Sequence, residues 1–222
     1  MLSVRKLGGD GLRQVGKFRR IIMLLIIANV VAASAVVVVW QSHGINPHWL
    51  YRDPNAVARQ PFYMGLLSNI GAIGWISAAA VTAFAFVAKC KIFEDRTDRS
   101  ILYVAVISAL FGLDDLLMLH DGLFPAIGLP GAAMYLAYLV LCLLWFLQHY
   151  RDIFAGPWLL AFIGFGCLGL SLVFDVVGDH LWHFPGMIAV EDAFKLLGIS
   201  FWCAYSAAAA LDVLRAGRVF SN

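Results

Sequence analysis

Six stretches of about twenty predominantly apolar residues constrain this chain more than any other feature. A helix needs about that length to cross a bilayer, because every backbone amide must be hydrogen-bonded within the segment. The stretches are predicted at residues 21–40, 62–88, 101–120, 131–148, 157–179 and 189–214. Of the 222 residues, 62% are apolar and 14% are charged, whereas water-soluble domains are about 45–50% apolar. The sequence therefore predicts an all-α integral membrane bundle of six transmembrane helices.

The basic residues predict which ends of these helices face the cytoplasm. If there are six spans, thirteen Lys and Arg residues lie in the tails and loops of one side, and only Arg52 and Arg59 lie in those of the other. Cytoplasmic loops carry the excess of Lys and Arg. We therefore expect a multi-pass protein of the cell inner (plasma) membrane with both termini cytoplasmic. Residues 1–20 are then a basic cytoplasmic tail, 21–215 the six-span domain, and 216–222 a second cytoplasmic tail.

Ionisable residues gather at the outer ends of the third, fifth and sixth predicted spans. Charged groups inside a membrane are costly and mark candidate functional sites. Seven carboxylates and one lysine belong to this group, with three histidines among them. They are Asp114, Asp115, Asp121, Asp175, Asp179, Glu191, Asp192, Lys195, His120, His180 and His183.

Helical spacing indicates which of these residues share a face. Residues four apart lie on one side of a helix, which applies to Asp175 with Asp179 and to Glu191 with Lys195. Asp114 and Asp121 are seven apart and are expected on a common face. His120 is offset from Asp114 and joins it only if the helix end frays. Three helices can thus present carboxylates to one cavity, with Ser68 and Asn69 at a similar depth.

The excess of carboxylates over lysine suggests a bound cation. Carboxylate and imidazole ligands together suit zinc, with iron or manganese as alternatives. The predicted ligands of this divalent metal ion are Asp115, His120, Asp175, Asp179 and His180. Glu191 is the predicted general base, and Lys195 is expected to orient Glu191 or to bind an anionic head group.

Simpler structural interpretations remain open for several of these residues. Asp121 precedes Gly122 and is expected to form a turn at a helix end, while Glu191 or Asp192 could cap the sixth span. The histidines and acidic residues of the other loops are expected to be solvated.

The segments FGLDDLLMLHD, DVVGDH and EDAFKLLGISFWCAY resemble a widespread set of uncharacterised bacterial membrane proteins. That resemblance implies a shared six-span fold. The pattern is also similar, at the level of a class, to membrane hydrolases such as alkaline ceramidases and adiponectin receptors, in which Ser, Asp and three His build a zinc site. The last span here lacks their HxxxH pattern, and His180 and His183 lie before it.

Three functions fit this pattern. The first is a metal-dependent, hydrolase-like membrane enzyme acting on a lipid or amphipathic substrate at the outer leaflet. The second is a cation- or proton-coupled transporter or channel, and the third is a structural membrane subunit. The inner half of the spans offers only scattered polar groups such as Asn29, Ser77, Thr82 and Ser108, which favours a one-sided pocket over a conduction path.

Membrane lipid is the expected partner, and a homo-oligomer could form through the second span. This span has a face of small residues, among them Gly71 and Gly74, that lets another helix approach closely. Nucleic acid is excluded as a partner, because the basic residues form no patch interleaved with aromatic residues. The four cysteines include no CxxC pair, which excludes a thiolate zinc knuckle.

Overall fold

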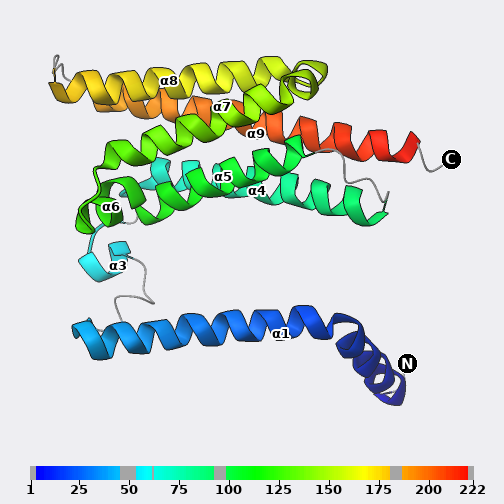
Figure 1. The fold of residues 1–222 in the computed structure, drawn as a ribbon. Coiled ribbons are helices and arrows are strands. Elements are labelled where there is room, and N and C mark those ends of the chain that lie inside the picture. The colour runs from blue at the N-terminus through cyan, green and yellow to red at the C-terminus, as the bar shows by residue number, and fades with distance from the viewer. Residues whose placement is uncertain (1–3, 46–53, 62, 93–98, 181–186, 220–222) are drawn as a thin grey trace. The chain divides into compact units, whose positions relative to one another are not determined.

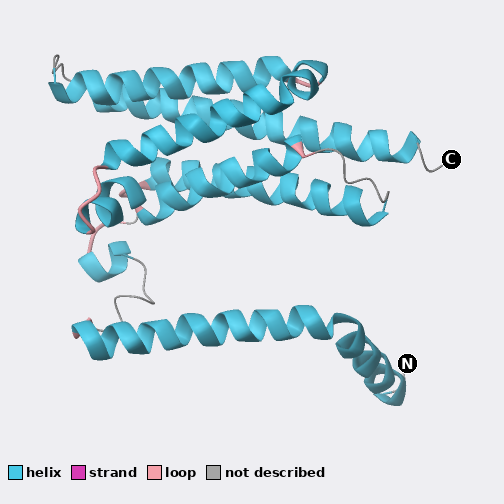
Figure 2. Ribbon diagram, in the orientation of Figure 1, coloured by secondary structure: helices cyan, strands magenta, loops and turns pink. Residues whose placement is uncertain are grey.

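The computed structural model describes residues 4–45, 54–61, 63–92, 99–180 and 187–219, and all regular structure in these ranges is helical (Figure 2). Six of the helices are long and apolar enough to cross a membrane. The predicted all-α class and the number of candidate spans are therefore confirmed. The chain divides into two compact units at residue 64.

The first unit contains α1 (Val4–His43) and the short α3 (Pro54–Ala58). The apolar part of α1 is Ile22–His43. The helix also extends backwards through the basic residues up to Val4, so most of the predicted basic tail is helical. Large apolar side chains along the apolar part are exposed within the chain.

The second unit is built from α4 (Leu66–Ile92), α5 (Ser100–Leu117), α7 (Gly131–Ala155), α8 (Trp158–His180) and α9 (Met187–Val219). Between α5 and α7 lie a π-helical turn, η1 (Leu119–Leu123), and a single turn, α6 (Phe124–Ala126). Helix α9 packs against both α4 and α8, and α4 also packs against α5 (Figure 1).

Helix α7 is packed less tightly than the others and crosses the unit obliquely. It lies beside η1 near its first residues, contacts α5 both there and near its last residues, and meets α8 near its last residues (Figure 1). There, Phe146 of α7 contacts Phe162 of α8, and Trp145 contacts Phe165. Helix α7 runs seven residues beyond the predicted end at Gln148, across a kink at His149, whose backbone is not helical.

Small residues allow the close approach of α9 to its neighbours. A Cβ added to Gly198 would lie 2.9 Å from the carbonyl oxygen of Gly164 in α8, so only glycine fits at this crossing. On the other side of α9, a Cβ added to Gly74 would lie 2.8 Å from Cγ2 of Ile199. The small-residue face of α4 thus packs against α9 within the chain, and an oligomer through this face stays a prediction.

Three tryptophans form the centre of the unit. Trp75, Trp145 and Trp202 are almost fully buried, and the ring of Trp202 contacts both of the others. The indole nitrogen of Trp202 donates to Ser108 Oγ at 2.8 Å, so its polar group is satisfied inside the apolar core. This centre joins α4, α5, α7 and α9.

The two ends of the second unit differ in charge. At one end, which we call the acidic end, lie Asp114, Asp115, Asp175 and Glu191. The opposite, basic end carries Lys89, Lys91, Arg151 and Arg215. This arrangement follows from the up-and-down path of the chain, because each long helix runs between the two ends.

Candidate functional site

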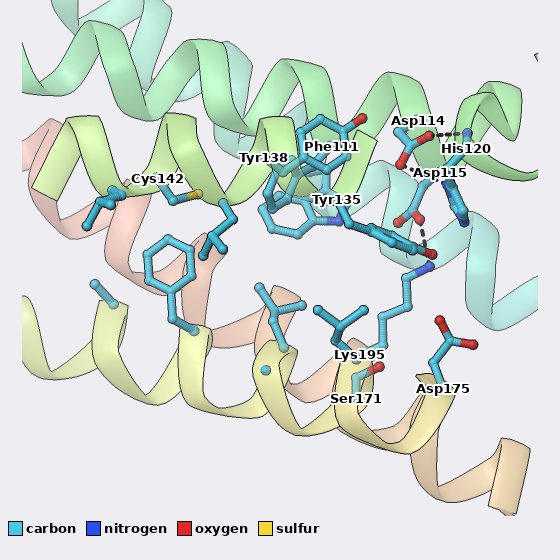
Figure 3. Close-up of a pocket in the computed structure, with 18 of the residues that line it drawn as sticks. Phe111, Asp114, Asp115, His120, Tyr135, Tyr138, Cys142, Ser171, Asp175 and Lys195 are labelled. Atoms are coloured by element: carbon cyan, nitrogen blue, oxygen red, sulfur yellow. Dashed lines mark hydrogen bonds and ion pairs between the residues drawn. The ribbon is translucent and has the colours of Figure 1, made fainter. Parts of the chain in front are cut away.

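A cavity of about 740 Å³ opens at the acidic end and extends between α5, α7, α8 and α9 (Figure 3). Its polar wall is formed by the residues near the acidic ends of the helices. They are Ser68 of α4, Asp114 and Asp115 of α5, His120 of η1, Tyr135 and Tyr138 of α7, Ser171 and Asp175 of α8, and Glu191 and Lys195 of α9. The site therefore collects polar groups from five helices and one turn.

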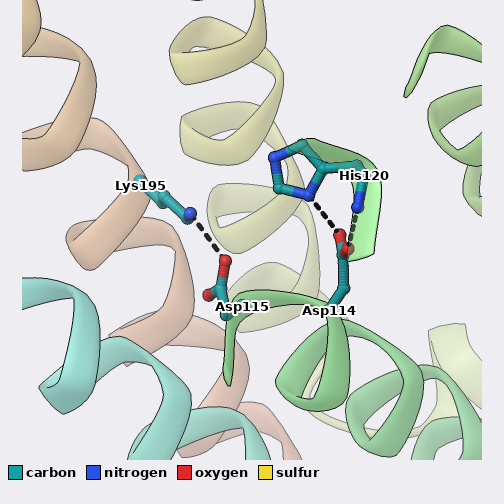
Figure 4. A network of polar contacts seen from close by, with 4 residues as sticks. All are labelled: Asp114, Asp115, His120 and Lys195. Atoms are coloured by element: carbon teal, nitrogen blue, oxygen red, sulfur yellow. Dashed lines mark hydrogen bonds and ion pairs between the residues drawn. The ribbon is translucent and has the colours of Figure 1, made fainter. Parts of the chain in front are cut away.

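Asp114 and His120 form the first polar pair in this wall (Figure 4). The carboxylate accepts from the backbone N–H of His120 at 2.9 Å, and its second oxygen lies 2.9 Å from His120 Nδ1. Both side chains are largely buried, with 7% of Asp114 and 15% of His120 exposed. Two contacts from one carboxylate fix both the position and the orientation of the imidazole.

A left-handed turn of the backbone after α5 brings Asp114 and His120 together. Helix α5 ends at Leu117, and Met118 follows in the left-handed region with φ 50° and ψ 47°. The chain then forms the π-helical turn that contains His120. A continuous helix would have placed His120 on a different face from Asp114. A non-glycine residue in this region costs free energy and is frequent at functional sites.

Lys195 and Asp115 form the second pair. Lys195 Nζ lies 2.6 Å from Asp115 Oδ1, which links α9 to α5 (Figure 4). Only 8% of the Asp115 side chain is exposed, against 36% for Lys195. The other carboxylate oxygen, Asp115 Oδ2, is buried and has no hydrogen-bond partner among the residues that the structure describes.

The remaining polar groups surround these two pairs. Figure 3 shows Asp175 on the opposite side of Lys195 from Asp115, and the hydroxyl end of Tyr135 directed towards the ion pair. Tyr138 lies close to Asp114, with its hydroxyl buried. Glu191 lies one turn before Lys195 on α9.

The rest of the cavity is apolar. Trp75, Phe111, Phe165 and Leu168 are among the side chains that line it, and along α7 the wall continues as far as Ile153. Four further lining residues are themselves exposed by 40–65%, namely Leu139 and Leu143 of α7 and Phe162 and Leu172 of α8. The cavity therefore opens sideways between α7 and α8, on a surface that is apolar enough to face lipid.

Five of the seven predicted site residues line this one cavity. They are Asp115, His120, Asp175, Glu191 and Lys195. The side chains of Asp179 and His180 lie outside the described residues, as do the side chain of Asp121 and the whole of His183. The catalytic and metal-binding roles of these residues stay predictions.

Two expectations about helix geometry are wrong, and a third stays untested. Asp114 and Asp121 share no helical face, because α5 ends between them at Leu117. Lys195 forms an ion pair with Asp115 on another helix, and its predicted role beside Glu191 or an anionic head group stays a prediction. Neither Glu191 nor Asp192 caps the last helix, because α9 already begins at Met187.

Sequence reasoning did not assign a role to Asp114, Tyr135 or Tyr138. The spacing of Tyr135 and Tyr138, three residues apart near the start of a span, could have placed them on one face with Cys142. Asp114 was among the candidate residues but received no role, because its contact with His120 depends on the left-handed backbone at Met118, and methionine gives no sign of such a backbone.

No three His, Cys, Asp or Glu side chains within the described part of the chain are grouped as metal ligands would be. The predicted ligand set includes Asp179 and His180, whose side chains lie outside the described part. Metal binding therefore stays a prediction that depends on these two residues.

The site can support acid–base chemistry without further assumptions. When Nδ1 of a histidine donates to a carboxylate, Nε2 is the ring nitrogen that can take up a proton. The carboxylate also stabilises the imidazolium that results. The ammonium of Lys195 stands on the same wall and can stabilise negative charge that develops on a bound molecule.

Comparison with known proteins identifies a family for this chain but no activity. No curated protein and no solved structure matches the chain. A family model, described as a domain of unknown function (DUF8692), matches residues 23–209, which include five of the six candidate spans almost completely and the cavity with its polar wall. The chain therefore belongs to the DUF8692 family.

Proposed function

We propose that this protein is a hydrolase-like membrane enzyme that acts on a lipid or amphipathic substrate in the cavity at the acidic end. The observation that carries the proposal is the buried Asp114–His120 pair, which stands at the polar end of an otherwise apolar cavity. A ligand site with apolar walls and a few convergent polar groups is typical of enzymes with apolar substrates.

The sideways opening supports a substrate that comes from the membrane. Leu139 and Leu172 border this opening, and a hydrocarbon chain that moves from lipid into the cavity leaves one apolar environment for another. Its polar group would stay near the membrane surface, where Asp114, His120 and Lys195 lie. The substrate would thus meet the polar wall without passing through the core of the bilayer.

In the proposed reaction, His120 acts as the general base and Asp114 positions it. His120 Nε2 takes a proton from water, and the resulting hydroxide forms a bond to the electrophilic carbon or phosphorus of the substrate. Lys195 stabilises the negative charge that develops there. His120 then gives its proton to the leaving group as the bond to that group breaks, which returns the imidazole to its neutral form. Glu191 stands near Lys195 as a second candidate base.

The orientation in the membrane is part of the same proposal. With both termini in the cytoplasm of a cell whose inner membrane holds the protein, the acidic end faces outward and the basic end inward. The excess of Lys and Arg at the basic end supports this orientation. The enzyme would then act at the outer leaflet.

Cation or proton transport is the alternative, and two buried hydroxyls of the inner half, those of Thr82 and Ser108, argue against it. Thr82 Oγ1 donates to the carbonyl of Ala78, and Ser108 Oγ donates to that of Val104. Both hydroxyls are fully buried and neither lines the cavity. Each hydroxyl donates its hydrogen bond within its own helix, and neither is placed to coordinate an ion that crosses the membrane.

A turnover assay separates these functions. The protein would be placed in nanodiscs made from a total membrane lipid extract, and mass spectrometry would follow loss of lipids and release of products. We expect His120→Gln and Asp114→Asn to lower the rate by at least about a hundredfold, the usual contribution of general acid–base catalysis. His149→Gln is the matched control, since His149 faces Asp152 at 3.3 Å outside this cavity.

The result that would overturn the proposal is an unchanged lipid profile together with cation or proton flux in proteoliposomes. That outcome would identify a transporter. Loss of turnover in His149→Gln as well as in His120→Gln would show that the variants act through general destabilisation.

A further inference from the structure

We propose that the cavity binds an acyl lipid, a molecule whose hydrocarbon chain is joined to its polar head through a carbonyl group. Two buried donors on the cavity wall, the hydroxyl of Ser171 and the indole N–H of Trp75, bond to oxygen atoms of this ligand. The inference names the substrate class of the site proposed above and therefore rests on that function.

The first donor is a serine at the border between the polar wall and the apolar part of the cavity. Ser171 lies on α8, one turn deeper than Asp175, and only 6% of it is exposed (Figure 3). Its hydroxyl makes no hydrogen bond with the described residues, whereas those of Thr82 and Ser108 donate within their own helices. Its oxygen is accessible from the cavity, while the equally unpartnered oxygen of Ser206 is closed off.

The second donor is the indole N–H of Trp75 on α4. The other two indoles of the tryptophan centre are satisfied, since Trp202 donates to Ser108 and Trp145 donates to Ser100. Trp75 lines the cavity and is only 2% exposed, yet its N–H has no hydrogen-bond acceptor among the described residues. Buried indole N–H groups usually have a partner. An indole N–H only donates, so the missing partner is an acceptor.

Both donors require the same kind of ligand atom, an oxygen that accepts a hydrogen bond inside the cavity. The carbonyl oxygen of an ester or an amide is such an acceptor, whereas a plain hydrocarbon chain has none. Ser171 and Trp75 come from different helices, so they need not share one oxygen. The link and the head of an acyl lipid together supply several oxygens.

The charges of the lining favour a neutral carbonyl over a phosphate. Sites that transfer phosphoryl groups hold them with clamps of Arg, Lys or metal ions. Among the described lining residues, Lys195 is the only Lys or Arg, and it is paired with Asp115 at 2.6 Å. A carbonyl needs only neutral donors until charge develops on it during the reaction.

An acyl carbonyl also supplies a bond for the proposed reaction to cleave. The hydroxide that His120 generates from water bonds to the carbonyl carbon, and negative charge develops on the carbonyl oxygen, which the wall donors stabilise. The bond between this carbon and the head group then breaks, and His120 returns the proton to the leaving oxygen or nitrogen. The products are a carboxylic acid, which releases its proton at neutral pH, and an alcohol or amine.

The apolar part of the cavity accommodates the chain. Along α7 the lining residues run from Tyr135 to Ile153, a distance of about 27 Å at the helical rise per residue. The volume of about 740 Å³ lies within the range of single-ligand pockets, which is about 300–1,000 Å³. The acyl chain therefore extends from the polar wall towards the basic end.

Photo-crosslinking tests the need for a carbonyl in the full-length protein in lipid nanodiscs. Three probes share one hexadecyl chain with a terminal diazirine and one glycerol-like head, and they are linked by an ester, an amide or an ether. The protein carries His120→Gln, so that the probes stay intact. We expect the ester and the amide to label peptides with Leu143 or Phe165 at concentrations about tenfold below that of the ether.

Matched variants assign this preference to the two donors. Ser171→Ala and Trp75→Phe should each weaken labelling by the carbonyl probes by about threefold or more, with labelling by the ether unchanged. Unchanged ether labelling shows that the cavity is intact, and Ser171→Ala alone decides if Trp75→Phe does not fold. Ser206→Ala is the control for the serine, because its hydroxyl is also buried and unpartnered but outside the cavity lining. Trp158→Phe, at a residue 40% exposed and outside the lining, is the control for the tryptophan.

Two results would overturn the inference. One is labelling of the cavity by the ether at the same concentration as by the ester and the amide. The other is a carbonyl preference that survives in Ser171→Ala or that falls equally in Ser206→Ala. Labelling by only one carbonyl probe supports the inference and identifies an O-acyl or an N-acyl lipid.

The same probes keep the two proposals apart. A carbonyl preference at the cavity without cleavage of any acyl probe or lipid by the wild-type protein would contradict the enzyme alone. Turnover of lipids by the wild-type protein, without a carbonyl preference in the labelling, would contradict the acyl-lipid inference alone.

Discussion

At the scale of single residues, the site depends on a backbone conformation that its amino-acid sequence does not predict. The position of Asp115, Asp175, Glu191 and Lys195 near helix ends could be predicted, because depth along a helix follows directly from residue number. The contact between Asp114 and His120 could not, because it requires the reversal at Met118. Glycine at that position would have been a signal, and methionine is not.

Buried hydrogen bonds of the tryptophan centre allow a first prediction at this scale. Ser108→Ala would remove the acceptor of Trp202 Nε1 while both groups stay buried. We expect unfolding in mixed micelles to become easier by about 1–3 kcal/mol, the cost of an unsatisfied buried donor. Ser200→Ala is the control, because Ser200 is exposed and bonds only within its own helix. Equal effects of the two substitutions would contradict the role assigned to Ser108.

At the scale of helices, hydropathy predicted how many there are better than where they end. All six candidate spans correspond to predicted ones, because crossing a membrane needs a length that few other segments have. Their ends are set by local contacts that hydropathy does not contain. Helix α5 stops three residues before its predicted end, while α7 continues past His149, and α9 starts at Met187.

The crossing of α8 and α9 gives a prediction at this scale. Gly198→Ala would bring a methyl group within 2.7 Å of Leu168 Cγ and 2.9 Å of the Gly164 carbonyl. Overpacking of this kind costs about 1–3 kcal/mol, so the thermal midpoint should fall. Gly166→Ala is a matched control on α8, since nothing lies within 4 Å of the added carbon. A midpoint that falls as much in Gly166→Ala would argue against a close crossing at Gly198.

At the scale of the whole molecule, the separation of charge between the two ends of the second unit is the main feature. In the proposed topology, it places the acidic wall at one membrane surface and most of the Lys and Arg residues of this unit at the other. Reporter fusions after Lys91 and at the C-terminus should therefore both report a cytoplasmic location, and a fusion near Asn55 an external one. Finding Lys91 and Asn55 on the same side would overturn the proposed topology.

Metal binding is also tested on the whole molecule, because a bound metal ion would raise the thermal stability of the protein. A cation bound only by the folded state stabilises it by mass action. If the predicted site of Asp115, His120, Asp175, Asp179 and His180 holds a metal, chelation should lower the thermal midpoint, and zinc, iron or manganese should restore it. Asp175→Asn should weaken that response by removing a ligand charge. A midpoint indifferent to chelator and metal would exclude a stabilising metal ion.

An experimental structure of the protein, extracted with its native lipids directly into nanodiscs, tests the central claim most directly. We expect elongated density between α5, α7, α8 and α9, with its polar end beside Asp115, Tyr138 and Lys195, and with His120 in contact with Asp114. A cavity filled by protein side chains, or carboxylates of Asp115, Asp175 and Glu191 that point into lipid or bulk water, would contradict the account.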